Sequence, residues 1–182
     1  MRIISGTLKG KKLLTPKKED DRIRPTADRA RETLFNILNS KQDTPLSCQN
    51  VLDIFSGTGA FGLEAASRGA KTVTFVDLDL TLTQKNAALC GFKNVHFIKK
   101  DARRLPLALS PYDLIFLDAP YNKGLTEPTL AALCANNYLA PHTLIIAETA
   151  KDEPLTIPPT LELIDERTSG AARFSFLTLK NE

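Results

Sequence analysis

The chain has 182 residues, of which 42% are hydrophobic and 25% are charged. This length fits a single domain, and the composition is that of an ordinary globular protein, which excludes a disordered chain, a collagen and a disulfide-stapled miniprotein. A chain of this size buries roughly 70% of the surface that it exposes when unfolded, so one core can support an enzyme-sized pocket without a metal or a crosslink.

Neither a membrane span nor a structural metal site is expected. No run approaches the ~20 consecutive apolar residues that cross a bilayer, and the N-terminus lacks the apolar stretch of a signal peptide, so we expect a cytoplasmic protein. Cys48, Cys90 and Cys134 are odd in number and far apart, and they form no C-x-x-C pair. A zinc site or a disulfide framework is therefore not predicted.

Positive charge is concentrated near the N-terminus. The formal net charge is only +3, yet residues 1–42 hold 11 Lys and Arg against 5 Asp and Glu. The first 18 residues contain no acid, and their basic side chains are Arg2, Lys9, Lys11, Lys12, Lys17 and Lys18. Such an arm is typical of a segment that meets polyphosphate, although a solvated extension would have the same composition.

In chain order, the first predicted element is a short basic hairpin of Ile3–Ser5 and Thr7–Leu14, followed by a polar linker that ends at Arg24. Thr26 can cap a helix in which Ala30, Leu34, Ile37 and Leu38 recur at helical spacing. We therefore divide the chain into a basic arm and linker, residues 1–24, and a main domain, residues 25–182.

From residue 50 onward, strand-length apolar runs alternate with helical stretches. The expected strands are Val51–Phe55, Thr72–Val76, Val95–Ile98, Tyr112–Leu117 and Thr143–Ala147, followed by a hairpin of Leu161–Arg167 and Arg173–Leu179. The expected helices are Phe61–Ser67, Leu80–Cys90 and Glu127–Asn136. This alternation predicts an α/β fold with a mostly parallel sheet, helices on both faces, and the first five strands buried on both faces. Ligands of such sheets bind at the carboxyl edge of the strands.

A glycine-rich turn follows the first expected strand. Gly57, Gly59 and Gly62 match G-x-G-x-x-G, and a residue without Cβ lets the backbone turn and approach a ligand. The pattern leaves two cofactors open: a dinucleotide, whose pyrophosphate sits on the helix N-terminus, or S-adenosylmethionine, which has no phosphate. Asp77, which closes the second strand, would accept hydrogen bonds from the ribose of either.

The position of Asp53 discriminates between the two candidate cofactors, because this residue lies inside the first strand, four residues before Gly57. A carboxylate there would face either a pyrophosphate or a cationic aminomethionine group, and only the second pairing is electrostatically favourable. A structural carboxylate that caps the loop amides is the alternative. At this point Leu52–Gly59 resembles the first motif of class I methyltransferases, hydrophobic-x-Asp-x-x-x-Gly-x-Gly.

That resemblance implies S-adenosylmethionine as the cofactor. The residues that it assigns to cofactor binding are Asp53, Phe55, Ser56, Gly57, Thr58, Gly59, Asp77, Asp101 and Ala102. Asp101 and Ala102 fit the position at which an acid and an adjacent backbone N–H read adenine. A helix cap is nearly as good an interpretation of Asp101.

A second motif, Asp118-Ala119-Pro120-Tyr121, follows the fourth expected strand and should emerge at the same edge as the cofactor. It resembles the [DNS]-P-P-[YFW] motif of methyltransferases that act on amino groups of planar systems, which implies these four residues as the catalytic motif. The chain has alanine where that motif usually has proline. Pro120 still biases Ala119 toward extended dihedrals, so its carbonyl should keep its direction. An ordinary turn with a buried Tyr121 is the alternative.

Beyond these motifs, Ile3–Leu13 and Arg24–Asn36 resemble the 16S ribosomal RNA (guanine-N2)-methyltransferase family called RsmD. The family implies a seven-stranded Rossmann-like sheet and a 16S rRNA partner, within the small subunit or an assembly intermediate. It also implies RNA contacts through the basic N-terminal region, here Lys9, Lys11, Lys12, Arg24, Arg29 and Arg31. A solvated helix face, with Arg31 paired to Asp28, is the alternative for Arg29 and Arg31.

The sequence thus predicts a monomeric enzyme that methylates the exocyclic N2 amine of a guanine in 16S rRNA. The alternatives are methylation of adenine N6, a nicotinamide-dependent oxidoreductase on the same frame, and an RNA-binding module whose cofactor site is vestigial. Deleting residues 1–18 should weaken RNA binding and leave cofactor affinity almost unchanged, because the arm is expected to contact phosphate only.

Overall fold

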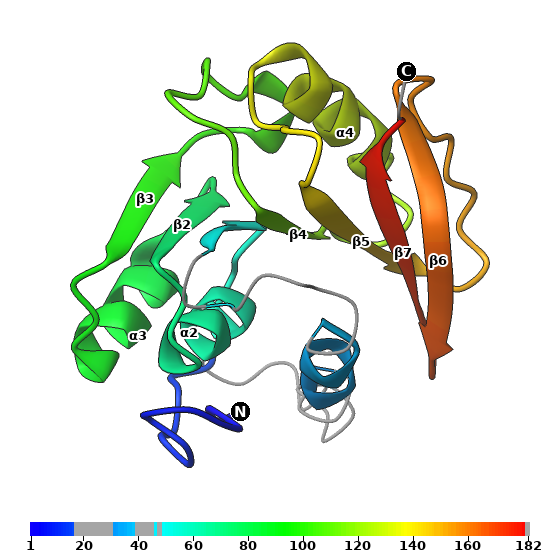
Figure 1. The fold of residues 1–182 in the computed structure, drawn as a ribbon. Helices are drawn as coiled ribbons and strands as arrows, with labels where there is room; N and C mark the ends of the chain where they lie inside the picture. Colours follow the sequence, from blue (N-terminus) through cyan, green and yellow to red (C-terminus); the bar gives the residue numbers. More distant parts are fainter. Residues whose placement is uncertain (17–30, 39–45, 47–48, 181–182) are drawn as a thin grey trace.

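The structure is a computed structural model that describes residues 1–16, 31–38, 46 and 49–180. Its seven-stranded sheet has the order β3-β2-β1-β4-β5-β7-β6 (Figure 1). The strands are β1 (Asn50–Ile54), β2 (Thr72–Asp77), β3 (Val95–Lys99), β4 (Leu114–Asp118), β5 (Leu144–Ala150), β6 (Leu161–Ser169) and β7 (Ala172–Leu179). Strands β1 to β5 pair in parallel, and β7 lies antiparallel between β5 and β6. The predicted α/β class and sheet are confirmed.

Helices cover both faces of the sheet (Figure 1). α2 (Ala60–Ser67), α3 (Thr81–Cys90) and the helical residues 31–38 share one apolar cluster with the sheet. α4 (Thr126–Ala135) and the short 3-10 helix η2 (Ala102–Arg104) share the other. The rings of Phe35, Phe61 and Phe116 stack in series, with centroids 4.9 and 4.0 Å apart. This stacking fixes the helical residues 31–38 against α2 and β4.

β3 departs from the prediction that the first five strands are buried on both faces. All of its side chains are half-buried or exposed. It is the terminal strand of the sheet, and within the described residues only the 3-residue η2 lies between it and β4. An edge position with so little cover leaves the strand open to solvent, whereas β1 and β4 at the centre are almost entirely buried.

The N-terminal arm, which we define as residues 1–16, packs on α2. Its two halves are joined by antiparallel hydrogen bonds, among them Ile3 N to Lys11 O at 2.9 Å, and by one isolated bridge between Arg2 and Lys12. The predicted two-stranded hairpin is therefore reduced to a single bridge. Ile3 and Leu13 are buried in the same core cluster as residues of α2, so the arm packs as part of the core of the main domain.

Part of the region between the arm and β1 lies outside the described residues. This part includes most of the predicted linker, Thr26, Ala30 and Cys48. No helix in the described part of the chain has the length and apolar character needed to cross a membrane.

Candidate active site

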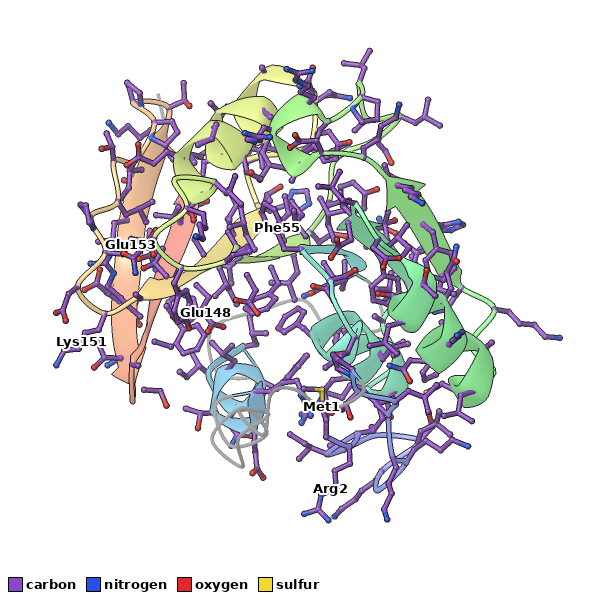
Figure 2. The ribbon with its side chains drawn as sticks, turned by 180° about the vertical axis from the view of Figure 1, so that it is seen from behind. Met1, Arg2, Phe55, Glu148, Lys151 and Glu153 are labelled. Carbon is purple, nitrogen blue, oxygen red and sulfur yellow. The ribbon has the colours of Figure 1, made fainter. Side chains whose placement is uncertain are left out.

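A cavity of about 230 Å³ opens at the carboxyl ends of the parallel strands, where the strand order changes direction between β1 and β4. Its lining joins distant segments: Asp53 and Phe55 from β1 and its loop, Asp118 from β4, Glu148 from β5, and Met1 and Arg31 from the N-terminal region. Figure 2 labels Met1, Phe55 and Glu148 around it. This edge is where an α/β sheet places its ligand.

The loop after β1 holds an unusual backbone conformation. Phe55, Gly57 and Gly59 have φ angles of 60°, 53° and 76°. For Phe55 this is a strained conformation, which the surrounding structure must enforce. Its N–H donates to the Val76 carbonyl at 2.9 Å, and the Thr83 hydroxyl donates to the Gly57 carbonyl at 2.8 Å. The loop is thereby fixed to β2 and α3.

The glycines of this loop have different roles, which the motif alone did not separate. A Cβ on Gly62 would lie 2.4 Å from the Phe75 ring, and one on Gly59 would lie 2.8 Å from the Thr83 methyl. These two glycines therefore permit the close packing of α2. Gly57 lines the cavity, and a Cβ there would meet nothing nearer than 4.0 Å. Of the three, only Gly57 occupies the ligand-facing position that was predicted for the motif.

Asp53 combines the loop cap, which was the alternative interpretation, with a place in the cavity wall. It is 2% exposed, and its Oδ2 accepts the Gly62 N–H at 2.9 Å, so it caps the loop. It also lines the cavity. Burial raises the pKa of Asp53 to about 8, against the opposing effect of the Gly62 hydrogen bond; Asp77 adds to the rise and Arg31 reduces it. A cationic ligand would favour its ionised form.

Asp118, the last residue of β4, and Glu148 within β5 lie side by side, because they are register partners. Both line the cavity together with Asp53. The surrounding protein raises the pKa of Asp118 well above its usual value, and the charges of Glu148 and Asp53 raise it further. Solvent reaches the exposed Asp118 side chain and moderates this effect. The cavity is thus lined by carboxylates that suit a cation.

Tyr121 is held beside the cavity by a contact that the motif did not predict. Its hydroxyl donates to Glu148 Oε1 at 2.5 Å, and its side chain is 37% exposed. The alternative of a turn with a buried tyrosine is therefore wrong. Ala119 is buried and Pro120 is exposed.

Asp77 and Asp101 lie outside the cavity lining. Asp77 Oδ2 accepts the Gly57 N–H at 2.9 Å, so it stays next to the loop. Asp101 caps η2 and forms an ion pair with Arg103 at 2.6 Å. The hydrogen bonds from Arg103 lower the pKa of Asp101 to about 2. The helix-cap interpretation describes its contacts, and Ala102 is buried in the core, so the adenine assignment of this pair stays a prediction.

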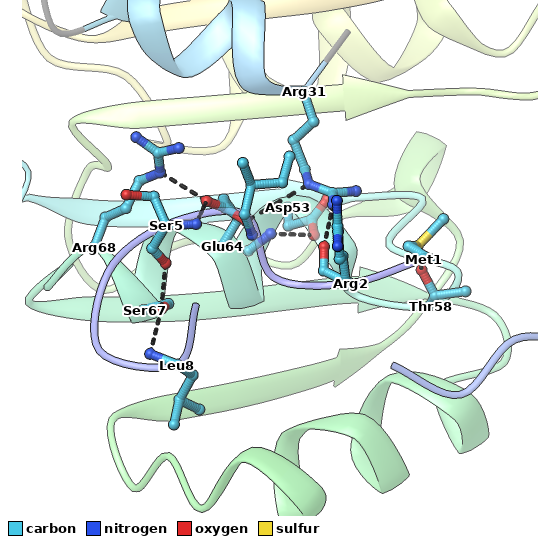
Figure 3. Close-up of polar contacts among 12 residues, drawn as sticks. Met1, Arg2, Ser5, Leu8, Arg31, Asp53, Thr58, Glu64, Ser67 and Arg68 are labelled. Atoms are coloured by element: carbon cyan, nitrogen blue, oxygen red, sulfur yellow. Dashed lines mark hydrogen bonds and ion pairs between the residues drawn. The ribbon is translucent and has the colours of Figure 1, made fainter. Parts of the chain in front are cut away.

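The basic residues divide into three groups. Lys9 and Lys12 are exposed on the arm and Lys11 is half-buried, while Arg24 and Arg29 lie outside the described residues. Arg31 is 6% exposed, its Nη2 donates to the Arg2 carbonyl at 2.5 Å, and its Nε lies 3.8 Å from Glu64 Oε2 (Figure 3). Because Arg31 is buried, the interpretation as a solvated helix face is wrong. Its place in the cavity wall favours a contact with the cofactor over the predicted contact with RNA phosphate.

Three residues of the site were not predicted from the sequence. Glu148 follows the apolar run Leu144–Ala147 much as Asp118 follows the run Leu114–Leu117, and that position was its signal. Glu64 lies between apolar residues of α2, so its burial could have been inferred. The Thr58 hydroxyl lies 3.3 Å from Met1 Sδ. No sequence pattern indicated this position of Met1, because the contact joins segments that are distant in the sequence.

The strand order, the glycine loop after β1 with its acid, and the acid-x-Pro-aromatic segment after β4 define a class I methyltransferase. The magnesium protoporphyrin IX methyltransferase (ChlM) of Synechocystis PCC 6803, solved with bound SAM, shares this fold with a TM-score of 0.66 at 15% identity, over 91% of this chain and 87% of that chain.

Greater similarity is found to proteins named for ribosomal RNA. The chain is 39% identical to "Ribosomal RNA small subunit methyltransferase D" of Haemophilus influenzae, over 96% of this chain and 91% of that protein. A solved Escherichia coli chain, the candidate methyltransferase yhhF, superposes with a TM-score of 0.83 at 33% identity, over 100% of this chain and 99% of that chain. The family described as "Conserved hypothetical protein 95" matches residues 1–178. The chain belongs to this family, the RsmD family of methyltransferases.

The residues of the cavity fit S-adenosylmethionine. The carboxylate of Asp53 complements its ammonium group, those of Asp118 and Glu148 complement the sulfonium charge, which S-adenosylhomocysteine lacks, and the guanidinium of Arg31 complements its carboxylate. Gly57, which carries no Cβ, leaves open space on the loop side. A dinucleotide fits this cavity poorly, since its pyrophosphate would meet a cluster of acids.

Proposed function

We propose that this enzyme transfers a methyl group from S-adenosylmethionine to the exocyclic N2 amine of a guanine in small-subunit ribosomal RNA. The observation that carries the proposal is that Asp118 and Asp53 line one cavity, while Tyr121 is hydrogen-bonded to Glu148 in its wall. The names of its relatives support the ribosomal RNA substrate. Their sequence similarity extends over 96% of this chain.

The cofactor would be held by its charged end. Asp53 would face the ammonium group and Arg31 the carboxylate, while Asp77 and the loop at Gly57 would take the ribose. When bound, S-adenosylmethionine supplies an electrophilic methyl group on a sulfonium. Asp101 and Ala102 remain our assignment for the adenine.

The target amine would be oriented by Asp118 and by the backbone carbonyl of Ala119. The lone pair of an exocyclic amine is delocalised into its ring, and acceptors placed on both hydrogens turn that lone pair toward the methyl group. Holding the amine in line also removes much of the entropic part of the barrier. Tyr121 would stack on a base that is extruded from a loop, where unstacking costs only a few kcal/mol.

Guanine suits this cavity better than adenine does. Guanine offers its N2 amine and the adjacent N1–H, which are both donors, whereas the N1 of adenine is an acceptor. Asp118 is an acceptor when ionised, and Glu148 lies next to it. The methylated amine is acidic enough to lose its proton to Asp118 or to water after the transfer, so no strong base is needed beforehand.

The RNA would meet the exposed lysines of the arm, Lys9 and Lys12, and the half-buried Lys11. Lysine neutralises phosphates without reading sequence. We further propose that the enzyme acts as a monomer in the cytoplasm, on the small subunit or on an assembly intermediate.

The test is transfer of tritiated methyl groups to small subunits from cells that lack this protein, followed by nucleoside analysis. N2-methylguanosine is the expected product, and N6-methyladenosine would overturn the substrate assignment. Asp118→Ala should cut the transfer rate by orders of magnitude with nearly unchanged affinity for S-adenosylhomocysteine. Calorimetric binding of NAD would instead support the oxidoreductase alternative.

A further inference from the structure

Glu148 lies at the junction of the acid cluster and the target-base site. It is the register partner of Asp118 on β4 and of Phe174 on β7, so strands on both sides fix its backbone. Its side chain is half-buried and lines the cavity. The position is therefore rigid and close to the residue that we assign to the target amine.

The hydrogen bond from Tyr121 to Glu148 links two segments 27 residues apart. At 2.5 Å it has the length of a charge-assisted O–H···O⁻ bond, which is about twice as strong as a neutral one. Tyr121 follows β4 in a turn that continues through Asn122, whose φ is 57°. Its side chain is 37% exposed, so packing alone does not hold the ring, and the bond to Glu148 supplies the missing restraint.

The electrostatics around this pair agree with the same role. Burial raises the pKa of Glu148, and the hydrogen bond from Tyr121 opposes that rise and favours the ionised carboxylate. Burial and the Glu148 carboxylate also raise the pKa of Tyr121, and the charges of Asp118 and Glu153 act in the same direction. The tyrosine therefore stays a neutral donor, and Glu148 stays an acceptor beside Asp118.

We propose that Glu148 is a positioning residue, which holds Tyr121 through its hydroxyl so that the ring is already oriented when the target base arrives. This inference rests on the proposed function and adds a residue to it that lies outside both sequence motifs. Because the ring is oriented before binding, the RNA does not have to order it. The contribution is therefore expected in the productive RNA complex and not in cofactor binding.

The experiment is a double-mutant cycle on the full chain with Glu148→Gln, Tyr121→Phe and the double variant. Methyl transfer to small subunits gives kcat and KM for RNA, and calorimetry gives the affinity for S-adenosylhomocysteine. Each single variant should lower kcat/KM for RNA by roughly tenfold or more, as expected for a hydrogen bond to a charged group. The double variant should fall little further, because both changes remove the same bond. Glu162→Gln on β6, which is not part of the cavity, is the matched control.

A second readout separates positioning from mere structural support. Glu148 raises the pKa of Asp118, so Glu148→Gln should move the acidic limb of the kcat profile to lower pH. Additive losses in the cycle, or an unshifted limb, would overturn the role of Glu148. Failure of the wild-type enzyme to methylate any RNA would instead overturn the proposed function. Unchanged affinity for S-adenosylhomocysteine shows that each variant is folded.

Discussion

The carboxylate of Glu64 accepts the backbone N–H of Ile4 at 2.7 Å across 60 residues of sequence. It also accepts the Ser5 N–H at 2.9 Å and the Arg68 Nε at 2.8 Å. Its side chain is fully buried, and these partners and Arg31 compensate its charge. Through Glu64, α2 determines where the N-terminal arm lies, and the arm in turn places Met1 in the wall of the cavity.

Glu64→Gln should destabilise the protein by about 3 kcal/mol, because it removes a carboxylate that is paired with Arg31 and Arg68 in a largely buried site. The free energy of unfolding in urea measures this. Glu162→Gln, which removes the same charge from β6, should change stability by less than about 0.5 kcal/mol. Equal effects of the two substitutions would show that the Glu64 network contributes nothing specific.

Deletion of residues 1–13 should weaken the binding of S-adenosylhomocysteine and lower the stability. This reverses the expectation from the sequence, since Ile3 and Leu13 are core residues and Met1 lines the cavity. Calorimetry on the folded fraction measures the affinity. An affinity equal to that of the full chain would mean that the arm is independent of the cofactor site.

Replacement of Lys9, Lys11 and Lys12 by glutamine separates the charge of the arm from its packing. Stability and cofactor affinity should hardly change. The slope of log K for RNA against log salt should become shallower by about 0.7 for each phosphate that the arm no longer neutralises. An unaltered slope would assign phosphate binding to other residues.

The stability of the protein should fall with rising pH between about pH 4 and pH 8 on account of Asp53. The pKa of Asp53 is raised from 3.8, the ordinary value that applies to the unfolded chain, to about 8 in the folded protein. Between these two values the folded state holds a proton that the unfolded state has released. The free energy of unfolding, measured relative to that of Asp53→Asn, should therefore decline by up to about 1.4 kcal/mol per pH unit. Asp118 and Glu148 act in the same direction and are present in both proteins. A pH-independent difference would contradict the raised pKa.

Gly62→Ala and Gly57→Ala should have different consequences. A Cβ at Gly62 meets the Phe75 ring at 2.4 Å, so the core must shift, at a cost of about 1–3 kcal/mol. A Cβ at Gly57 meets open space, and the backbone strain at its φ of 53° costs about 1–2 kcal/mol. Of the two variants, only Gly57→Ala should also weaken the binding of S-adenosylhomocysteine, because its methyl group enters the cavity. Thermal unfolding and calorimetry on both variants test the distinction.

Much of this protein follows from local sequence. Strand-length apolar runs and helical spacing are local patterns, and they predicted the seven strands and the alternation of strands and helices. The same kind of signal predicted that Asp53 and Asp118 meet at one edge, because parallel strands end there and bring their last residues together. The roles proposed for Asp118 and Tyr121 came instead from the resemblance of residues 118–121 to a methyltransferase motif.

Tertiary structure alone decided what the distant segments do to one another. The burial of Arg31, the anchoring of Ile4 by Glu64, the bond between Tyr121 and Glu148 and the place of Met1 in the cavity all join residues at least 27 apart. No periodicity records such contacts, because they depend on how the arm and strands pack. The basic arm therefore appeared as a separate segment in the sequence, although its apolar residues Ile3 and Leu13 tie it to the core.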